Sequence, residues 1–319
     1  EISAINMAIG SWYAGGRGMT TTSGGGFALM EEGISLAGMA ETPVVVHIGQ
    51  RPGPATGLPT RTEQGDLNLV LHAGHGDFAR VILSPGNIED CFYLSKYAFS
   101  LADKFQIPVF ILTDQYLLDC QYNMPTFDYK KYEIKKYIVK TEKEYQRYQF
   151  TKTGVSPRGI PGFGEGLVIQ TGNEHNEIGH VSENAILRSK MVEKRFKEKL
   201  NQLKNEVIYP ELLGGKAYKF LAIGWGSTRN IVEEALKQLK EPKLGFLYFK
   251  QVYPLPREMM GYLINAQKVI AIENNASGQF ADLIKKETGF DIKYKILKYD
   301  GRPFSVEEVV ARIKDILEE

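Results

Sequence analysis

The sequence predicts an α/β protein made of two doubly wound domains. Its 319 residues exceed what a single hydrophobic core usually supports, so two domains are expected. Short, continuously apolar runs such as Val44–Ile48 and residues 108–113 are typical of strands buried on both faces. Segments with apolar residues at helical spacing separate these runs, and this alternation predicts parallel sheets covered by helices.

The first series of elements lies between residues 2 and 113. We expect helices over residues 2–10, 27–40 and 88–105, and strands over residues 19–22, 44–48, 79–83 and 108–113. The strand segments are β-branched or apolar, whereas the helical segments place apolar residues three or four apart. Between the first strand and the second helix, Ser23–Gly26 predicts a turn in which the backbone approaches another group closely.

A connector of unusual length follows, beginning at about residue 120. Residues 128–148 are rich in Lys and Tyr and predict an exposed excursion, residues 156–166 predict irregular backbone, and residues 188–206 predict a long solvated helix. Connectors of this length usually wrap a partner or cross to a neighbouring subunit. We place the first domain, with its connector, at residues 1–190.

The second domain is expected at residues 205–319. Strands are predicted over residues 218–224, 244–249, 268–273 and 292–297, and helices over 230–239, after Pro254–Pro256, after Gln279 and over 306–317. Neither a G-x-G-x-x-G nor a Walker glycine pattern occurs in the chain, so the usual sequence signals for a bound nucleotide are missing.

Composition narrows the possible classes of function. The net charge of +1 gives no electrostatic argument for nucleic acid or anionic membrane as a partner. Two cysteines cannot build a disulfide framework or an iron–sulfur cluster, so we expect a reducing, cytoplasmic compartment. No apolar run reaches the roughly 20 residues that span a bilayer. The chain opens inside a helical pattern without Met, and we expect that its natural start is missing.

The most informative segment is a loop rich in Gly and Pro that follows the apolar strand at residues 44–48. Arg51 stands at its start, where an open parallel sheet places its ligand, outside the carboxyl end of a strand. A guanidinium there can bind a carboxylate through two parallel hydrogen bonds, and the prolines reduce the entropy lost when the loop orders. The alternative interpretation is an ordinary surface loop with a solvated arginine.

Several short segments match one known family in their order along the chain. They are EISAINMAIG at residues 1–10, TSGGGF at 22–27, RPGPATGLPT at 51–60, QGD at 64–66, GNEH at 172–175 and ENN at 273–275. On these residues the chain resembles the α subunit of 2-oxoacid:ferredoxin oxidoreductases, most closely the 2-oxoglutarate type. The resemblance implies a pyrimidine-binding domain of thiamine diphosphate enzymes, followed by a domain similar to the C-terminal domain of transketolases.

The resemblance also implies roles for five residues. Glu1 would bind the ring nitrogen of the aminopyrimidine and favour the imino form that removes the thiazolium proton. Ser23 and Gly24 would lie beside the pyrimidine, although Gly25 stands where the family usually has proline. Arg51 would bind the substrate carboxylate, and Thr60 would donate a hydrogen bond near the substrate.

Two family motifs do not occur in this sequence. The Tyr-Pro-Ile-Thr-Pro substrate motif normally precedes the position of Glu1, which fits a missing N-terminal segment. The Gly-Asp-Gly motif for diphosphate and Mg²⁺ belongs in the family to a β subunit, which also carries an iron–sulfur cluster. The resemblance therefore implies a chain that is inactive alone, a β partner, coenzyme A as co-substrate and ferredoxin as electron acceptor; γ and δ subunits are a further option.

No metal site is expected on this chain. His175 and His180 lie five residues apart with two glutamates between them, but their flanks are irregular and Gly-rich and no cysteine is near. His75 stands in a turn and is open to either a substrate role or a structural one. Glu273–Asn275 is expected to shape a strand–helix turn or a subunit interface.

The proposed reaction is oxidative decarboxylation of a 2-oxoacid to acyl-CoA and CO₂, with 2-oxoglutarate as the nearest substrate and pyruvate or branched 2-oxoacids as alternatives. Arg61 could add a second positive charge for a distal carboxylate, or be solvated. A transketolase-like or dehydrogenase E1-β-like subunit is a second interpretation, and a non-catalytic scaffold is a third. Sugar-converting enzymes need no carboxylate clamp, so the Arg51 loop separates the first interpretation from the second.

Overall fold

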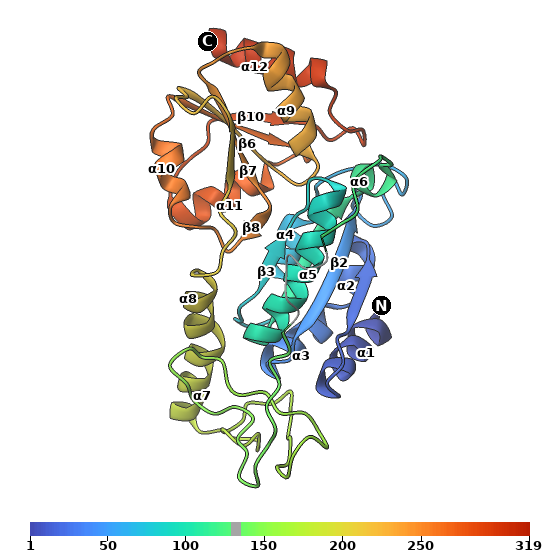
Figure 1. Cartoon of the computed structure of the whole chain (residues 1–319), viewed down its shortest axis with the longest axis vertical. Helices are drawn as coiled ribbons and strands as arrows, with labels where there is room; N and C mark the ends of the chain where they lie inside the picture. Colours follow the sequence, from blue (N-terminus) through green and yellow to red (C-terminus); the bar gives the residue numbers. More distant parts are fainter. Residues whose placement is uncertain (129–134) are drawn as a thin grey trace.

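The computed structural model describes residues 1–128 and 135–319, and it contains two α/β domains joined by a long connector (Figure 1). The elements of the first domain and connector are α1 (Ile2–Tyr13), β1 (Met19–Thr22), α2 (Gly24–Ala28), α3 (Glu31–Met39), β2 (Val44–Gln50), α4 (Leu67–His72), β3 (Val81–Leu83), α5 (Ile88–Phe105), β4 (Pro108–Asp114), α6 (Gln115–Asp119), α7 (Ala185–Val192), the π-helical segment η1 (Glu193–Glu198) and α8 (Lys199–Leu203). Those of the second domain are β5 (Glu211–Gly214), β6 (Phe220–Trp225), α9 (Thr228–Leu239), β7 (Leu244–Phe249), β8 (Gln251–Tyr253), α10 (Met259–Ile264), β9 (Lys268–Glu273), α11 (Gln279–Thr288), β10 (Tyr294–Leu297) and α12 (Val306–Glu318).

The first sheet has the strand order β1-β2-β4-β3-β8. Its first four strands are parallel, with Val44 opposite Pro108 and Gln50 opposite Asp114 in the central pair. The fifth strand, β8, comes from the second half of the chain and runs antiparallel to β3. A strand of the second series thus completes the sheet of the first domain.

Successive residues of β2 enter different hydrophobic cores, as the period of two in a strand requires. Val44, Val46 and Ile48 pack in a cluster with residues of α1, whereas Val45 packs in a second cluster with residues of α5. Helices therefore cover both faces of the sheet, and the doubly wound prediction is confirmed for this domain.

The second sheet has the order β10-β9-β6-β7-β5, with four parallel strands and an antiparallel edge strand, β5. Its face toward α9 and α12 forms a core of its own around Phe246 and Ile270. Its other face, with Leu221 and Phe249, joins the same cluster as the first domain. The two domains therefore share one continuous core, and the α/β fold class predicted from the sequence is confirmed.

Three local predictions were wrong. Ser23–Gly26 is not a turn, because Ser23 is the N-cap of α2 and the three glycines form the first turn of that helix. The helix predicted over residues 27–40 is two helices, α2 and α3, separated at Leu29 and Met30. Strands β5 and β8 were not predicted, since both are short edge strands whose partners lie far away in the sequence.

The connector also differs from its prediction. Of the excursion expected at residues 128–148, residues 129–134 lie outside the described part, but Arg147 and Tyr148 are fully buried. The segment expected as a solvated helix is α7, η1 and α8 in succession, and it buries Lys194 and Lys199 completely. A charge-rich sequence does not reveal which of its charges have a buried partner.

The buried partner of Lys194 and Lys199 is Glu41, which lies just before β2 at the amino edge of the first sheet. Its carboxylate pairs with the Lys194 ammonium and, at 2.6 Å, with that of Lys199. Arg147 donates from Nη2 to the Glu41 carbonyl oxygen at 2.6 Å and from Nη1 to Gln106 Oε1 at 2.8 Å. These cations hold the pKa of Glu41 well below its usual range although burial opposes them. The connector is thereby clamped to the edge of the sheet opposite the strand carboxyl ends.

Among the described residues, no helix combines the length and the apolar character that crossing a bilayer requires.

Replacing Glu41 by Gln should lower the free energy of unfolding by about 3–5 kcal/mol at pH 7, because Lys194 and Lys199 would remain buried without a counter-charge. The loss should be smaller once the pH has risen through about 8, since burial lowers the pKa of Lys199 to about 8 and this group is then neutral with or without Glu41. Urea unfolding at pH 7 and pH 9.5 measures both effects. The matched control is Glu193→Gln, whose partner Lys197 is exposed and which should change stability little. An equal loss in both variants would contradict a buried clamp.

Candidate functional site

Four of the five residues predicted to form the site, all except Thr60, gather at the carboxyl ends of the strands of the first sheet. Ser23 follows β1 and Arg51 follows β2, next to each other in the sheet, while Glu1 is the N-cap of α1. In an open parallel sheet this edge is where ligands bind. The fold thus brings residues 1, 23 and 51 to one side of the molecule.

Glu1 contacts the start of α2. Its Oε1 lies 3.5 Å from the Thr22 hydroxyl, which donates to it, and the side chain is otherwise exposed. A Cβ atom on Gly26 would lie 2.5 Å from Glu1 Oε1 and would also collide with the Thr22 hydroxyl. Only glycine at position 26 therefore allows the Glu1 carboxylate to lie against this helix.

A second carboxylate, that of Asp66, lies at the same helix and was not identified from the sequence. A Cβ atom on Gly24 would be 2.6 Å from Asp66 Oδ2, and within the described residues this oxygen is buried without a hydrogen-bond partner. Burial raises the pKa of Asp66 to about 6, while the nearby Arg51 guanidinium opposes the rise. The only sequence signal was its place in the matching segment QGD.

The Arg51 loop folds back on itself over α2. Gly57 has a φ of +53°, and a side chain there would collide with the Pro52 carbonyl oxygen, which accepts a hydrogen bond from the Leu58 amide at 3.1 Å. The Ala55 carbonyl oxygen lies 3.8 Å from where a Cβ of Gly25 would stand. The tip of the loop therefore faces Gly25, which lies between the two glycines that contact Asp66 and Glu1.

The far end of the loop is fixed to the second domain by Gln64, whose side chain is completely buried. Its Nε2 donates to the Trp225 carbonyl oxygen at 2.8 Å, and its Oε1 accepts from the Asn274 amide at 3.0 Å. Its backbone amide donates to the Asn274 carbonyl oxygen at 2.6 Å. Trp225 and Asn274 lie at the carboxyl ends of β6 and β9. The carboxyl edge of each of the two sheets therefore points toward the Arg51 loop.

The segment Glu273–Asn275 shapes a strand–helix turn, one of the two roles expected for it. The buried Glu273 carboxylate accepts from the Phe280 and Ala281 amides at 2.9 Å, at the start of α11. Asn275 Oδ1 accepts from the Gly278 amide at 2.7 Å, and its Nδ2 donates to the Gln64 carbonyl oxygen at 3.2 Å. The turn thus also supports the anchor of the Arg51 loop.

Thr60 lies elsewhere in the loop and lines a separate cavity of about 280 Å³ together with Arg61, Tyr116 and Arg302.

A polar row that the sequence did not reveal crosses the first sheet at His47. Its Nδ1 lies 2.7 Å from the Thr21 hydroxyl and its Nε2 lies 2.8 Å from that of Thr113, and burial lowers its pKa.

His175 is buried and its ring lies 3.7 Å from that of Tyr148, while Nδ1 donates to the Asn173 carbonyl oxygen at 2.8 Å. Within residues 1–128 and 135–319, no three His, Cys, Asp or Glu side chains are grouped so that they could hold a metal ion. His75 is exposed and pairs with Glu32 at 3.1 Å.

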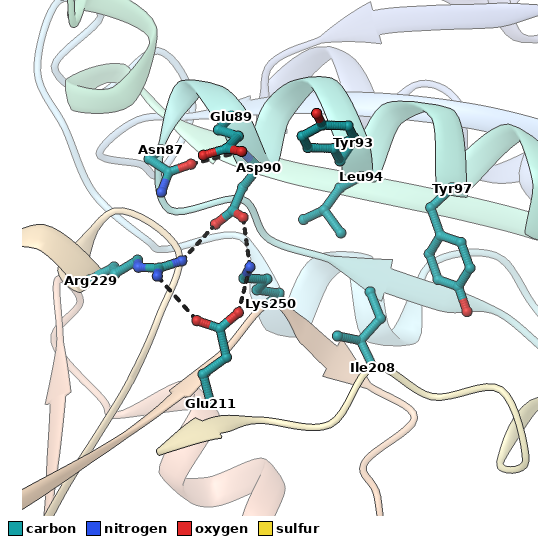
Figure 2. Close-up of a pocket in the computed structure, with 10 residues that line it drawn as sticks. All are labelled: Asn87, Glu89, Asp90, Tyr93, Leu94, Tyr97, Ile208, Glu211, Arg229 and Lys250. Atoms are coloured by element: carbon teal, nitrogen blue, oxygen red, sulfur yellow. Dashed lines mark hydrogen bonds and ion pairs between the residues drawn. The ribbon is translucent and has the colours of Figure 1, made fainter. Parts of the chain in front are cut away.

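A larger cavity of about 440 Å³ separates α5 from the second domain (Figure 2). Four charged side chains face one another there in a closed ring. Asp90 pairs with Arg229 at 3.4 Å and with Lys250 at 2.8 Å, and Glu211 pairs with the same two cations at 3.1 and 2.6 Å. Because each charge has opposite partners on both sides, we interpret the ring as a contact between the domains and not as the ligand site.

Residues 1–194 match the family model described as "Pyruvate flavodoxin/ferredoxin oxidoreductase, thiamine diP-bdg". The chain belongs to the 2-oxoacid:ferredoxin oxidoreductase alpha-subunit family. The match includes Glu1, Ser23, Gly24, Arg51 and Thr60 and runs to the connector. The family resemblance predicted from the sequence is confirmed.

Relatives in this oxidoreductase family agree. The chain is 38% identical over 319 residues to "2-oxoacid:ferredoxin oxidoreductase 1, subunit alpha" of Sulfurisphaera tokodaii, covering 97% of this chain and 50% of that protein. It is 34% identical over 279 residues to "2-oxoglutarate synthase subunit KorA" of Methanocaldococcus jannaschii, covering 86% of this chain and 74% of that protein. The chain thus spans about half the length of the first of these relatives.

A solved structure is similar over almost the whole chain. It is the 2-oxoglutarate:ferredoxin oxidoreductase of Magnetococcus marinus with 2-oxoglutarate, coenzyme A and succinyl-CoA bound. The TM-score is 0.86 at 34% identity, over 98% of this chain and 55% of that one. Both domains of the present chain therefore have counterparts in an oxidoreductase of this family.

Asp66→Asn should make stability less dependent on pH. The pKa of Asp66 is about 6 in the folded chain and about 4 in the unfolded chain. The folded chain therefore binds this proton more tightly, and its stability falls as the pH rises between these two values. Relative to the parent, Asp66→Asn should gain about 2 kcal/mol on going from pH 4 to pH 8, because the unfolded-state carboxyl is already half ionised at pH 4. Urea unfolding at both pH values measures the difference, with Asp77→Asn as the exposed control. A gain that is the same at both pH values would contradict the raised pKa.

Proposed function

We propose that this chain supplies the pyrimidine side of a thiamine diphosphate site in an enzyme that oxidatively decarboxylates a 2-oxoacid. The observation that carries the proposal is the Arg51 loop, which is folded over α2 beside the carboxylates of Glu1 and Asp66. A loop that only covered the surface would need neither the glycines beneath it nor a cation next to a buried carboxylate.

The residues present fit the aminopyrimidine of thiamine diphosphate. The start of α2 has no side chains, because it consists of Gly24, Gly25 and Gly26. A side chain on Gly24 or Gly26 would displace a carboxylate. Within the described residues Glu1 has one long hydrogen bond, from Thr22, and its carboxyl group is otherwise free to share a proton with a ring nitrogen, which favours the imino form. The cofactor, when bound, would supply the nucleophilic carbon that a 2-oxoacid needs in order to lose CO₂.

In this proposal Arg51 binds the substrate carboxylate and keeps it next to the reacting carbon. The guanidinium offers two parallel donors, which fix the orientation of a carboxylate as well as its position. Asp66 lies near Arg51, whose charge opposes the rise that burial causes in the pKa of Asp66, and Ser23 stands at the start of α2. We propose 2-oxoglutarate as substrate because relatives named for it match this chain.

The proposal requires a partner. The diphosphate, Mg²⁺ and an iron–sulfur cluster would be held by a β subunit, electrons would pass to ferredoxin, and coenzyme A would take the acyl group. A relative of Sulfurisphaera tokodaii is named as one subunit of such an enzyme. We further propose domain limits at residues 1–190 and 205–319 and a cytoplasmic location.

Arg51→Gln should lower kcat/KM for 2-oxoglutarate at least about 100-fold, because two charge-assisted hydrogen bonds to the carboxylate are lost. The measurement is methyl-viologen reduction by the complete enzyme with thiamine diphosphate, Mg²⁺ and coenzyme A. Arg51→Lys keeps the charge but loses the paired donors, so its activity should lie between that of Arg51→Gln and that of the parent.

The matched control is Arg257→Gln, which removes an exposed arginine of the second domain and should leave kcat/KM unchanged. Full activity of Arg51→Gln would refute the clamp. A well-formed complex without activity on any 2-oxoacid would refute the reaction and favour a transketolase-like subunit or a scaffold.

A further inference from the structure

The cavity that contains Thr60 lies between the two domains. Its walls come from the Arg51 loop, from α6 after β4, and from the loop Gly301–Pro303 after β10. Thr62, which is buried, donates from its amide to the Gly301 carbonyl oxygen at 3.1 Å and accepts at its hydroxyl from the Tyr116 amide at 3.1 Å. The three walls are therefore fixed to one another by hydrogen bonds at the base of the cavity.

Two arginines from different domains meet at this cavity. A Cβ atom on Gly301 would lie 3.2 Å from Arg61 Cβ, so the stem of Arg61 lies directly against the loop that carries Arg302. Both side chains are exposed and both line the cavity. Two like charges that line one cavity repel each other, and an anion bound in that cavity would relieve the repulsion.

Neither guanidinium has an ion-pair partner in the described part of the chain. Among the described residues, the one carboxylate that lines the cavity is that of Asp119, and it accepts a hydrogen bond from Gln115 Nε2 at 2.9 Å. Asp300 lies near Arg302, but its carboxylate pairs with Lys298 at 3.3 Å. This arrangement differs from the ring of Figure 2, where Arg229 and Lys250 each have at least two carboxylate partners.

We propose that the cavity between Arg61 and Arg302 is a second anion site, which binds an oxyanion group of the substrate or co-substrate. Arginine pairs recognise carboxylates and phosphates alike, and the Thr60 hydroxyl, which lines the same cavity, can donate to a remaining oxygen. The oxyanion is the distal carboxylate of a dicarboxylic 2-oxoacid or a phosphate of coenzyme A. The link to these two compounds rests on the proposed function; the anion site itself does not.

Binding can be measured without activity, because Cys120 lines the same cavity while Cys91 lines an apolar groove on α5. Burial raises the pKa of both thiols, so alkylation is followed at pH 9. Inorganic phosphate should slow the reaction of Cys120 with iodoacetamide in a saturable way and leave Cys91 unaffected. Anionic iodoacetate should react faster with Cys120, relative to iodoacetamide, in the parent enzyme than in Arg61→Gln/Arg302→Gln.

The kinetic experiments separate the two sources of the oxyanion. If the site takes a distal carboxylate, the double variant should raise KM for 2-oxoglutarate at least tenfold and leave KM for pyruvate and for coenzyme A unchanged. If it takes a phosphate, KM for coenzyme A should rise at least tenfold and KM for 2-oxoglutarate should stay the same. Arg257→Gln, which removes a distant exposed arginine, should change none of these constants.

Saturable protection of Cys120 by phosphate, lost in the double variant, would support the anion site even in an enzyme that oxidises no 2-oxoacid. Conversely, 2-oxoacid activity together with Cys120 alkylation that ignores phosphate and both substitutions would overturn the anion site and leave the proposed function intact. Protection that persists in the double variant would also overturn it, because the anion would then bind without the arginines.

Discussion

The arrangement of the site depends on one buried amide. Gln64 ends the loop that starts at Arg51, and both polar atoms of its side chain pair with backbone groups of the second domain. A buried amide left without partners costs about 1–3 kcal/mol per group, so the loop cannot leave the second domain without a large loss. The Arg51 loop is therefore held at its start by β2 and at its end, through Gln64, by the carboxyl ends of β6 and β9.

This constraint accompanies a core that the two domains share, in addition to the core that each has of its own. The Asp114 carboxylate, at the end of β4, accepts hydrogen bonds from Ser227 of the second domain and from the Leu117 amide, and β8 returns to complete the first sheet. At the opposite edge, Glu41 holds the connector through Lys194 and Lys199. The strand carboxyl ends of both sheets are thus left facing each other, with the Arg51 loop between them, while the connector occupies the other end of the molecule (Figure 1).

Local sequence patterns predicted the elements whose periodicity is strong. The helix at residues 88–105 and the strands at 244–249 and 268–273 have the predicted limits. The spacing of their apolar residues indicates the type of element, and structure-breaking residues on either side indicate where it begins and ends. Long-range pairing decided what was missed: β8 exists only because β3 is its neighbour, and Lys194 is buried only because Glu41 lies opposite. Likewise the grouping of Glu1, Ser23, Gly24 and Arg51 followed from family motifs, whereas the charge of Asp66 next to Arg51 became apparent only in the folded chain. Thr60 lies in another cavity, and its role stays a prediction.

The most direct test of this constraint is amide hydrogen exchange over residues 51–66 in the parent and in Gln64→Leu. Leucine has a similar volume but cannot bond to Trp225 or Asn274, so we predict that exchange in this loop becomes at least about tenfold faster. Exchange in α5, on the other face of the first sheet, should remain as in the parent. Unchanged exchange in the loop of a folded Gln64→Leu protein would contradict the claim that the second domain holds the Arg51 loop in place.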